Sequence, residues 1–156
     1  MKDPVKSKSN MMDYVVSCDR DSEELEKLIR GEKTMIVRGS MIRKMPYNKV
    51  KPGEILYFVN NDGDGLVRAA AVVKKITEYG PVNSEESLSL LKMYQHSLYL
   101  SEKQMQQYIG KRYMVLIEVV SVCRIMEFRL DQLVYESAID WLPVKNIELM
   151  KDKYLY

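Results

Sequence analysis

The spacing of apolar residues changes several times along the chain, which predicts strands and helices in mixed order. Five runs are rich in β-branched, aromatic or small apolar residues, as is typical of strands: residues 12–18, 35–39, 55–59, 66–76 and 113–125. The last run is apolar almost throughout, which predicts a central strand buried on both faces. Within the fourth run, Ala69–Ala71 indicate close packing against a neighbour or a bulge.

Helical spacing predicts three short helices, over residues 21–31, from Asn83 or Ser84 to Gln95, and over 101–110. Asp21 and Glu24 are spaced to cap the first helix, and Gly31 is placed to end it. Ser101 and Gln104 form a capping box at the start of the third. Together the elements predict an α+β domain, a small β-barrel in which five or six strands curl around a core and two or three short helices cover the openings.

Several segments are expected to be irregular. The cluster Asn60–Gly65 (NNDGDG) predicts a hairpin loop rather than a calcium site, because it lacks the downstream glutamate of an EF-hand. Trp141 and Pro143 are expected in a loop, with the Trp141 ring plugging one end of the barrel rather than stacking on a ligand. Residues 1–10 are polar and are expected to form a disordered leader, so that one domain spans 11–156.

The composition narrows the functional classes without choosing one. A chain of 156 residues, 46% hydrophobic and 29% charged, suits one globular domain, and a net charge of +2 does not by itself indicate nucleic-acid binding. No apolar run is long enough for a membrane helix and no secretory signal is present, so we expect a cytoplasmic protein. Cys18 and Cys123 are expected as free thiols, and one histidine without a CxxC pair argues against zinc; nothing indicates a cofactor.

A basic segment follows the second predicted strand and is the strongest candidate for contact with phosphate. Tyr47 lies among five cations between residues 38 and 51, namely Arg38, Arg43, Lys44, Lys49 and Lys51. Cations interleaved with an aromatic side chain suit single-stranded nucleic acid, because they release counterions from phosphate while the ring stacks on a base. The alternative interpretation is a solvated surface loop.

Lys33 and Arg38 flank the second predicted strand. Their separation places them on opposite faces of an ideal strand, so they share a site only if the chain bends or Lys33 lies before the strand. Gly31 and Gly39 permit such bends. Arginine suits an anion because its planar fork holds phosphate at two points. The alternative role for both residues is a solvated strand edge, where lysine deters pairing with other sheets.

The order of these elements resembles the ASCH family of PUA-like β-barrels. The residues that carry the resemblance are Gly31, Lys33 and Arg38, in the spacing G-x-K-x-x-E-x-R, and the later KPGEILYFV; the position of the motif glutamate holds Ile36. The resemblance implies a PUA-like barrel with a cleft between barrel and helix, and a binding module for RNA or a modified nucleotide. On this basis we expect the binding residues to be Lys33, Arg38, Ser40, Arg43, Lys44, Tyr47 and His96.

Two other functions remain open. Some ASCH proteins are amidohydrolases that act on acetylated cytidine, so the resemblance also implies this reaction, with Lys33 as nucleophile or base and His96 as proton shuttle. The family's catalytic threonine position is again Ile36, although Thr34 lies close by. The alternative role for His96 is packing at a helix end. The third interpretation is a protein-interaction domain without a nucleic-acid role, and the sequence does not predict the oligomeric state.

Overall fold

The structure is a computed structural model that describes residues 10–137 and 140–151. Apart from Asn10, the predicted leader lies outside the described residues, as do residues 152–156. Six strands form one sheet in the order β2-β5-β4-β3-β1-β6, in which β1 and β3 are parallel and all other neighbours antiparallel. The strands are β1 (Asp13–Cys18), β2 (Met35–Ser40), β3 (Ile55–Asn60), β4 (Leu66–Tyr79), β5 (Tyr113–Arg129) and β6 (Trp141–Val144).

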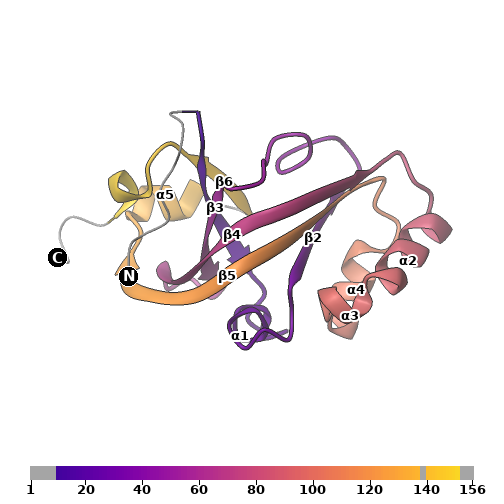
Figure 1. The fold of residues 1–156 in the computed structure, drawn as a ribbon, viewed down its shortest axis with the longest axis horizontal. Helices are drawn as coiled ribbons and strands as arrows, with labels where there is room; N and C mark the ends of the chain where they lie inside the picture. Colours follow the sequence, from indigo (N-terminus) through magenta and orange to yellow (C-terminus); the bar gives the residue numbers. More distant parts are fainter. Residues whose placement is uncertain (1–9, 138–139, 152–156) are drawn as a thin grey trace.

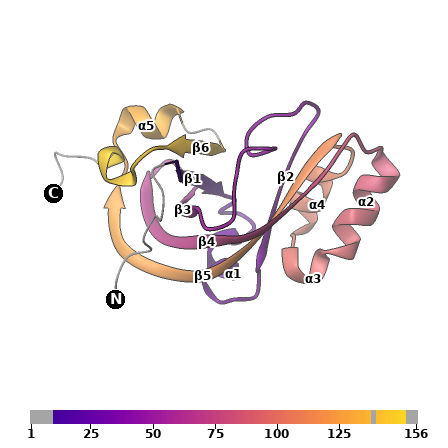
Figure 2. The ribbon, with the colours of Figure 1, turned by 45° about the horizontal axis from the view of Figure 1, so that its top comes forward.

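The sheet curls, and the helices cover its two ends. Figures 1 and 2 show the long strands β4 and β5 bending together across the molecule, with three helices gathered at one end and α5 beside β6 at the other. The helices are α1 (Glu24–Ile29), α2 (Ser84–Met93), α3 (Gln95–Leu98), α4 (Glu102–Tyr108), α5 (Gln132–Ser137) and the 3-10 helix η1 (Ile147–Met150). The predicted α+β fold with a small, curled barrel sheet of five or six strands is confirmed, and the sheet forms a half-barrel. The one-turn α3 and the short α5 come in addition to the helices predicted from the sequence.

Strand β2 divides the core into two layers. Its alternating side chains send Ile36 into the cluster inside the curled sheet, with Tyr14 and Phe58, while Met35 and Val37 pack in the cluster beneath α2–α4. Ile36 is 1% exposed, so the position of the family's motif glutamate is a core position in this chain. Arg38, two residues further on, shares the inner face of β2 and is buried as well.

Strand β5 is buried on both faces over its first half, as predicted. Val115 and Ile117 belong to the inner cluster, and Met114 and Leu116 to the cluster under the helices. The prediction that the run 113–125 is buried throughout is wrong for its second half, where Val120 is 38% exposed. The reason is that β2 is short and pairs with β5 only as far as Glu118. Beyond Glu118, β5 pairs with β4 alone among the described strands and forms an edge of the sheet.

The loops and caps follow the sequence closely, with one exception. The β3–β4 connection is the predicted hairpin, and the pairing of β4 with β5 shifts register around Ala69–Ala71, where a bulge was one expectation. Capping boxes are present at Asn83 and Ser101. The expected cap at Asp21 is wrong: α1 begins after Glu23, whose φ is 53°, and no side chain caps it.

Trp141 lies in a strand rather than in the predicted loop. It begins β6, which pairs antiparallel with β1 and places Pro143 opposite Tyr14. A proline in a strand is tolerated here because β6 lies at the edge of the sheet, where one side of its backbone needs no partner. The expected role as a plug is confirmed, since Trp141 is 7% exposed and its ring centroid lies 6.1 Å from that of Tyr14.

Candidate ligand-binding cavity

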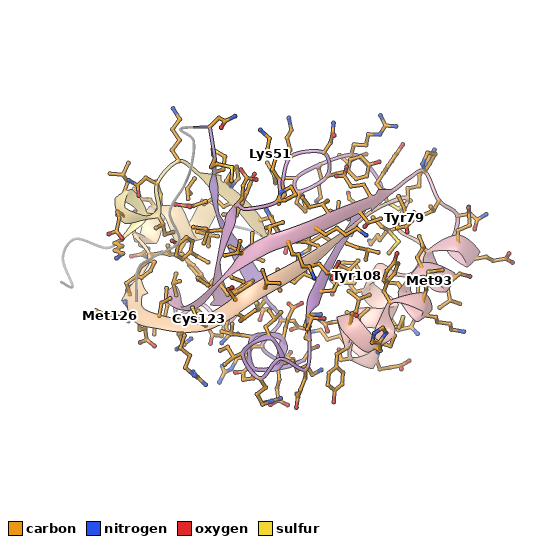
Figure 3. All side chains as sticks on the ribbon, in the orientation of Figure 1. Lys51, Tyr79, Met93, Tyr108, Cys123 and Met126 are labelled. Atoms are coloured by element: carbon orange, nitrogen blue, oxygen red, sulfur yellow. The ribbon has the colours of Figure 1, made fainter. Side chains whose placement is uncertain are left out.

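A cavity of about 480 Å³ opens where the ends of β1 and β2, the β2–β3 loop, α4 and the start of β5 converge. This volume is in the usual range for sites that enclose a small ligand. The floor of the cavity consists of the buried residues Cys18, Glu24, Arg38 and Tyr108. The rim consists of Lys44, Tyr47, Lys111 and Tyr113, which are exposed or half-buried. In Figure 3, Tyr108 lies where β5 and β2 meet the helical end of the molecule.

Arg38 is the central cation of the floor, and its donors are already engaged by the protein. Nε donates to Asp140 Oδ1 at 2.9 Å, and Nη2 donates to the Ser17 carbonyl at 2.6 Å. Nη1 donates to the Val37 carbonyl at 2.8 Å and reaches the Tyr108 hydroxyl at 3.5 Å. Because few N–H groups of Arg38 are left without an acceptor, Arg38 positions the floor residues rather than binding an anion with two N–H groups.

The charge of Arg38 is balanced locally. Burial alone would lower the pKa of its guanidinium, but Tyr108, Asp140 and Glu24 outweigh burial and raise that pKa well above its ordinary value. The Glu24 carboxylate lies 3.8 Å from Arg38 Nη1, and the Trp141 ring packs 5.7 Å from the guanidinium carbon. Arg38 is therefore permanently charged and compensated from several directions.

Glu24 joins the two motif cations. Its Oε2 lies 3.5 Å from Lys33 Nζ, and its Oε1 accepts a hydrogen bond from the Asp19 backbone at 3.0 Å. Lys33 lies before β2 begins, as a shared site required, and also donates to the Leu98 carbonyl. The carboxylate that lies near both Lys33 and Arg38 therefore comes from Glu24 on α1.

Burial also changes the acid–base behaviour of the floor. Desolvation lowers the pKa of Lys33 below its usual 10.5, and the Glu24 charge offsets part of that effect. Burial, followed by the charge of Glu24, raises the pKa of the Cys18 thiol well above its usual value, so this cysteine is a protonated thiol at neutral pH. Both cysteines are free, as expected; Cys18 is buried and Cys123 half-buried, at a separate apolar groove.

The rim carries cations without ion-pair partners. Neither Lys44 nor Lys111 contacts a carboxylate among residues 10–137 and 140–151. Gly39 allows the two sides of the rim to approach, because a Cβ there would lie 3.0 Å from Lys111 Cβ. Lys103, by contrast, is paired with Asp19 at 3.1 Å and Asp21 at 3.3 Å. Lys44 and Lys111 are therefore two lining cations whose charge is available to a ligand.

Aromatic rings and arginines stack beside these lysines. Tyr47 and Tyr113 meet edge to face, with ring centroids 5.6 Å apart. The guanidinium carbons of Arg43 and Arg112 lie 5.2 and 5.9 Å from the centre of the Tyr113 ring. Such cation–π contacts hold the arginines at the rim while leaving their charge available. The arrangement joins the predicted basic segment to a second basic and aromatic cluster at 111–113.

The structure brings together some of the predicted site residues and separates others. Arg38, Ser40, Lys44 and Tyr47 line the cavity. Lys33 is 1% exposed and lies behind Glu24, so it does not line the cavity. Arg43 is not a lining residue either, but its guanidinium packs on the ring of Tyr113, which is one. The other lining residues were not predicted as site residues, and those with charged or aromatic side chains that matter most here are Glu24, Tyr108, Lys111, Tyr113 and Asp140.

His96 does not line the cavity. It is an exposed residue of α3, and its nearest described polar partner is the Ser97 hydroxyl, 3.4 Å from Nε2. The helix is nevertheless connected to the floor, because the Ser97 carbonyl accepts from the Thr34 backbone and the Leu98 carbonyl from Lys33. No residue of α3 lines the cavity, and the helix that forms its wall is α4, through Gln104, Gln107 and Tyr108.

No family model matches the sequence, and no curated protein matches it. No described helix is long and apolar enough to cross a membrane, and the described part of the chain holds no group of three or more His, Cys, Asp or Glu side chains placed to hold a metal ion.

Solved structures do resemble this one. The crystal structure of the ASCH protein of Zymomonas mobilis superposes with a TM-score of 0.64 at 19% identity, covering 88% of this chain and 90% of that chain. A mutant of the same protein gives the same TM-score over 90% of this chain. The N-terminal domain of McrB from Staphylothermus marinus gives 0.55 at 12% identity, covering 94% and 96% of the two chains. At these identities the likeness concerns the fold, and the protein therefore has the ASCH-type, PUA-like fold.

Proposed function

We propose that the cavity binds RNA or a nucleotide, with one base inside and the phosphates at the rim. The observation that carries this proposal is the division of the cavity into a buried, charge-balanced floor and a rim. At the rim, two lysines without an ion-pair partner among the described residues lie beside tyrosines that meet edge to face. Cationic rims with aromatic platforms are how proteins bind single-stranded nucleic acid: the cations meet phosphate and the rings stack on bases.

The floor does not suit phosphate. The Arg38 donors are largely occupied, and two carboxylates, those of Glu24 and Asp140, lie within ion-pair distance of its guanidinium. A phosphate at this depth would meet their negative charge. Lys44 and Lys111 have no such neighbours among the described residues. The orientation with the base at the floor and the phosphate at the rim follows from this distribution of charge.

The test is the salt dependence of binding to a short labelled single-stranded RNA. We expect Lys44→Ala/Lys111→Ala to weaken binding and to reduce the slope of log K against log salt by about 1.4, because each phosphate contact in a single strand contributes about 0.7. Fluorescence anisotropy over a series of salt concentrations gives both quantities. The matched control is Lys75→Ala/Lys92→Ala, which removes the same charge from exposed positions outside the cavity. Equal weakening by the two double variants, or no binding at low salt, would contradict the proposal.

A second candidate function is the amidohydrolase reaction on an acetylated cytidine. It is favoured by one observation: burial lowers the pKa of Lys33, as a nucleophilic or basic lysine requires, and Glu24 lies beside it on the cavity floor. The reaction needs the substrate to reach Lys33 past Glu24. Turnover of acetylcytidine that is lost in Lys33→Ala would favour this candidate, whereas turnover that survives the substitution would exclude the role of Lys33.

A further inference from the structure

Asp140 stands apart from the other carboxylates around the cavity, because part of it is open to a ligand. Half of its side chain is exposed, while Glu24 is buried and Asp19 accepts hydrogen bonds from Ser22 and Lys103. Asp140 Oδ1 accepts from Arg38 Nε, and no described donor lies within hydrogen-bond reach of Oδ2. An anchored carboxylate with free acceptor positions therefore lines the cavity.

Arg38 and the Ser17 backbone together hold Asp140 in one position. The Nε contact fixes one oxygen at 2.9 Å, the Asp140 carbonyl accepts from the Ser17 backbone at 2.9 Å, and the Arg38 guanidinium is itself held by the Ser17 and Val37 carbonyls. A carboxylate held in this way selects among ligands more sharply than a free surface side chain, because little conformational entropy is lost on binding.

We propose that Asp140 is a specificity-determining residue that selects a base with two adjacent N–H donors, the arrangement found on guanine. This inference rests on the proposed nucleotide site. A carboxylate only accepts hydrogen bonds, and guanine presents its ring N–H and its exocyclic amino group side by side. Uracil presents one N–H between two carbonyl oxygens, which would face the negative carboxylate. Adenine and cytosine present an amino group beside an unprotonated ring nitrogen. The order of affinity is therefore guanine first and uracil last.

The test compares guanosine monophosphate with inosine monophosphate, which differs from it by the absence of the 2-amino group. Isothermal titration with the full chain at low salt should give a dissociation constant about tenfold lower for the guanine nucleotide, the size expected for one hydrogen bond to a charged acceptor. Uridine monophosphate should bind more weakly than either. This ligand comparison is made on the wild-type protein and needs no variant.

Two substitutions assign the preference to Asp140. In Asp140→Asn, the amide oxygen can still accept from Arg38, but the preference for guanosine over inosine monophosphate should fall to about twofold or less. The control is Glu127→Gln: Glu127 is 51% exposed and pairs with Arg68, much as Asp140 is 50% exposed and pairs with Arg38. The control should keep the full preference.

The outcomes separate this inference from the proposed function. Equal affinity for the two purine nucleotides in the wild-type protein would overturn the role of Asp140 and leave the nucleotide site standing. A guanine preference that survives Asp140→Asn would do the same. No binding of any of the three nucleotides, together with no binding of single-stranded RNA, would overturn both.

Discussion

Replacing Arg38 with methionine should lower the free energy of unfolding by about 3–5 kcal/mol. Removing one member of a buried ion pair leaves the other charge without compensation, and the loss is of this size in other proteins. Here the substitution would leave Glu24 buried without one of its two cations and Asp140 without its Nε donor. Urea denaturation measured at neutral pH gives the value directly.

The control for this prediction is Arg68→Met. Arg68 also contacts two carboxylates, Asp64 at 2.7 Å and Glu127 at 3.1 Å, but on the surface of the sheet with 30% of its side chain exposed. We expect it to change the free energy of unfolding by about 1 kcal/mol or less, since solvent screens such pairs. Similar losses in both variants would contradict the view that Arg38 organises a buried floor.

Replacing Glu24 with glutamine should lower the free energy of unfolding by about 3 kcal/mol at pH 7, and the loss should shrink as the pH rises towards 10.5. Without Glu24, the already lowered pKa of Lys33 falls further, because the charge that opposed desolvation is gone. Between that native pKa and the unfolded value, the unfolded chain binds more protons than the folded one. Stability therefore increases with pH in this window, and more steeply in the variant than in the wild type.

The measurement is the difference in free energy of unfolding between wild type and variant at several pH values from 7 to 10.5. Taking the difference removes the contribution of those titrating groups whose pKa Glu24 does not change. Glu32→Gln is the matched control, because Glu32 pairs with Arg30 at 3.0 Å with both side chains about half exposed. It should show a small loss that does not depend on pH. A loss in Glu24→Gln that is constant over this range would show that Lys33 is not the group coupled to Glu24.

The fold could be predicted from the sequence because its signals are local. The hairpin at Asn60–Gly65, the capping boxes at Asn83 and Ser101, and the alternation in β2 each depend on residues a few positions apart. Where prediction was wrong, a longer-range fact decided the outcome. The Trp141 segment forms a strand because it pairs with the edge of β1, and no residue near Trp141 in the sequence indicates this pairing.

The site was predictable only in part, for a related reason. The basic loop around Lys44 and Tyr47 is visible as a run of residues, and the cluster at 111–113 has the same composition. Glu24 gave a weaker signal: it lies one helical turn before Leu28 and so shares a face with a core residue. The contact between Arg38 and Asp140 joins residues 102 positions apart, and nothing local in the sequence indicates it.

We expect a nucleotide to bind in the cavity above Arg38. The most direct test is to map amide chemical-shift changes in the labelled protein during titration with guanosine monophosphate. We predict that the largest changes fall on residues that line the cavity, such as Gly39, Ser40, Lys44 and Lys111. The apolar groove lined by Cys123 and Met126 should be unaffected. Figure 3 shows these two residues on the other side of the molecule from the α2–α4 helices. Changes confined to that groove, or none at saturating nucleotide, would contradict the account.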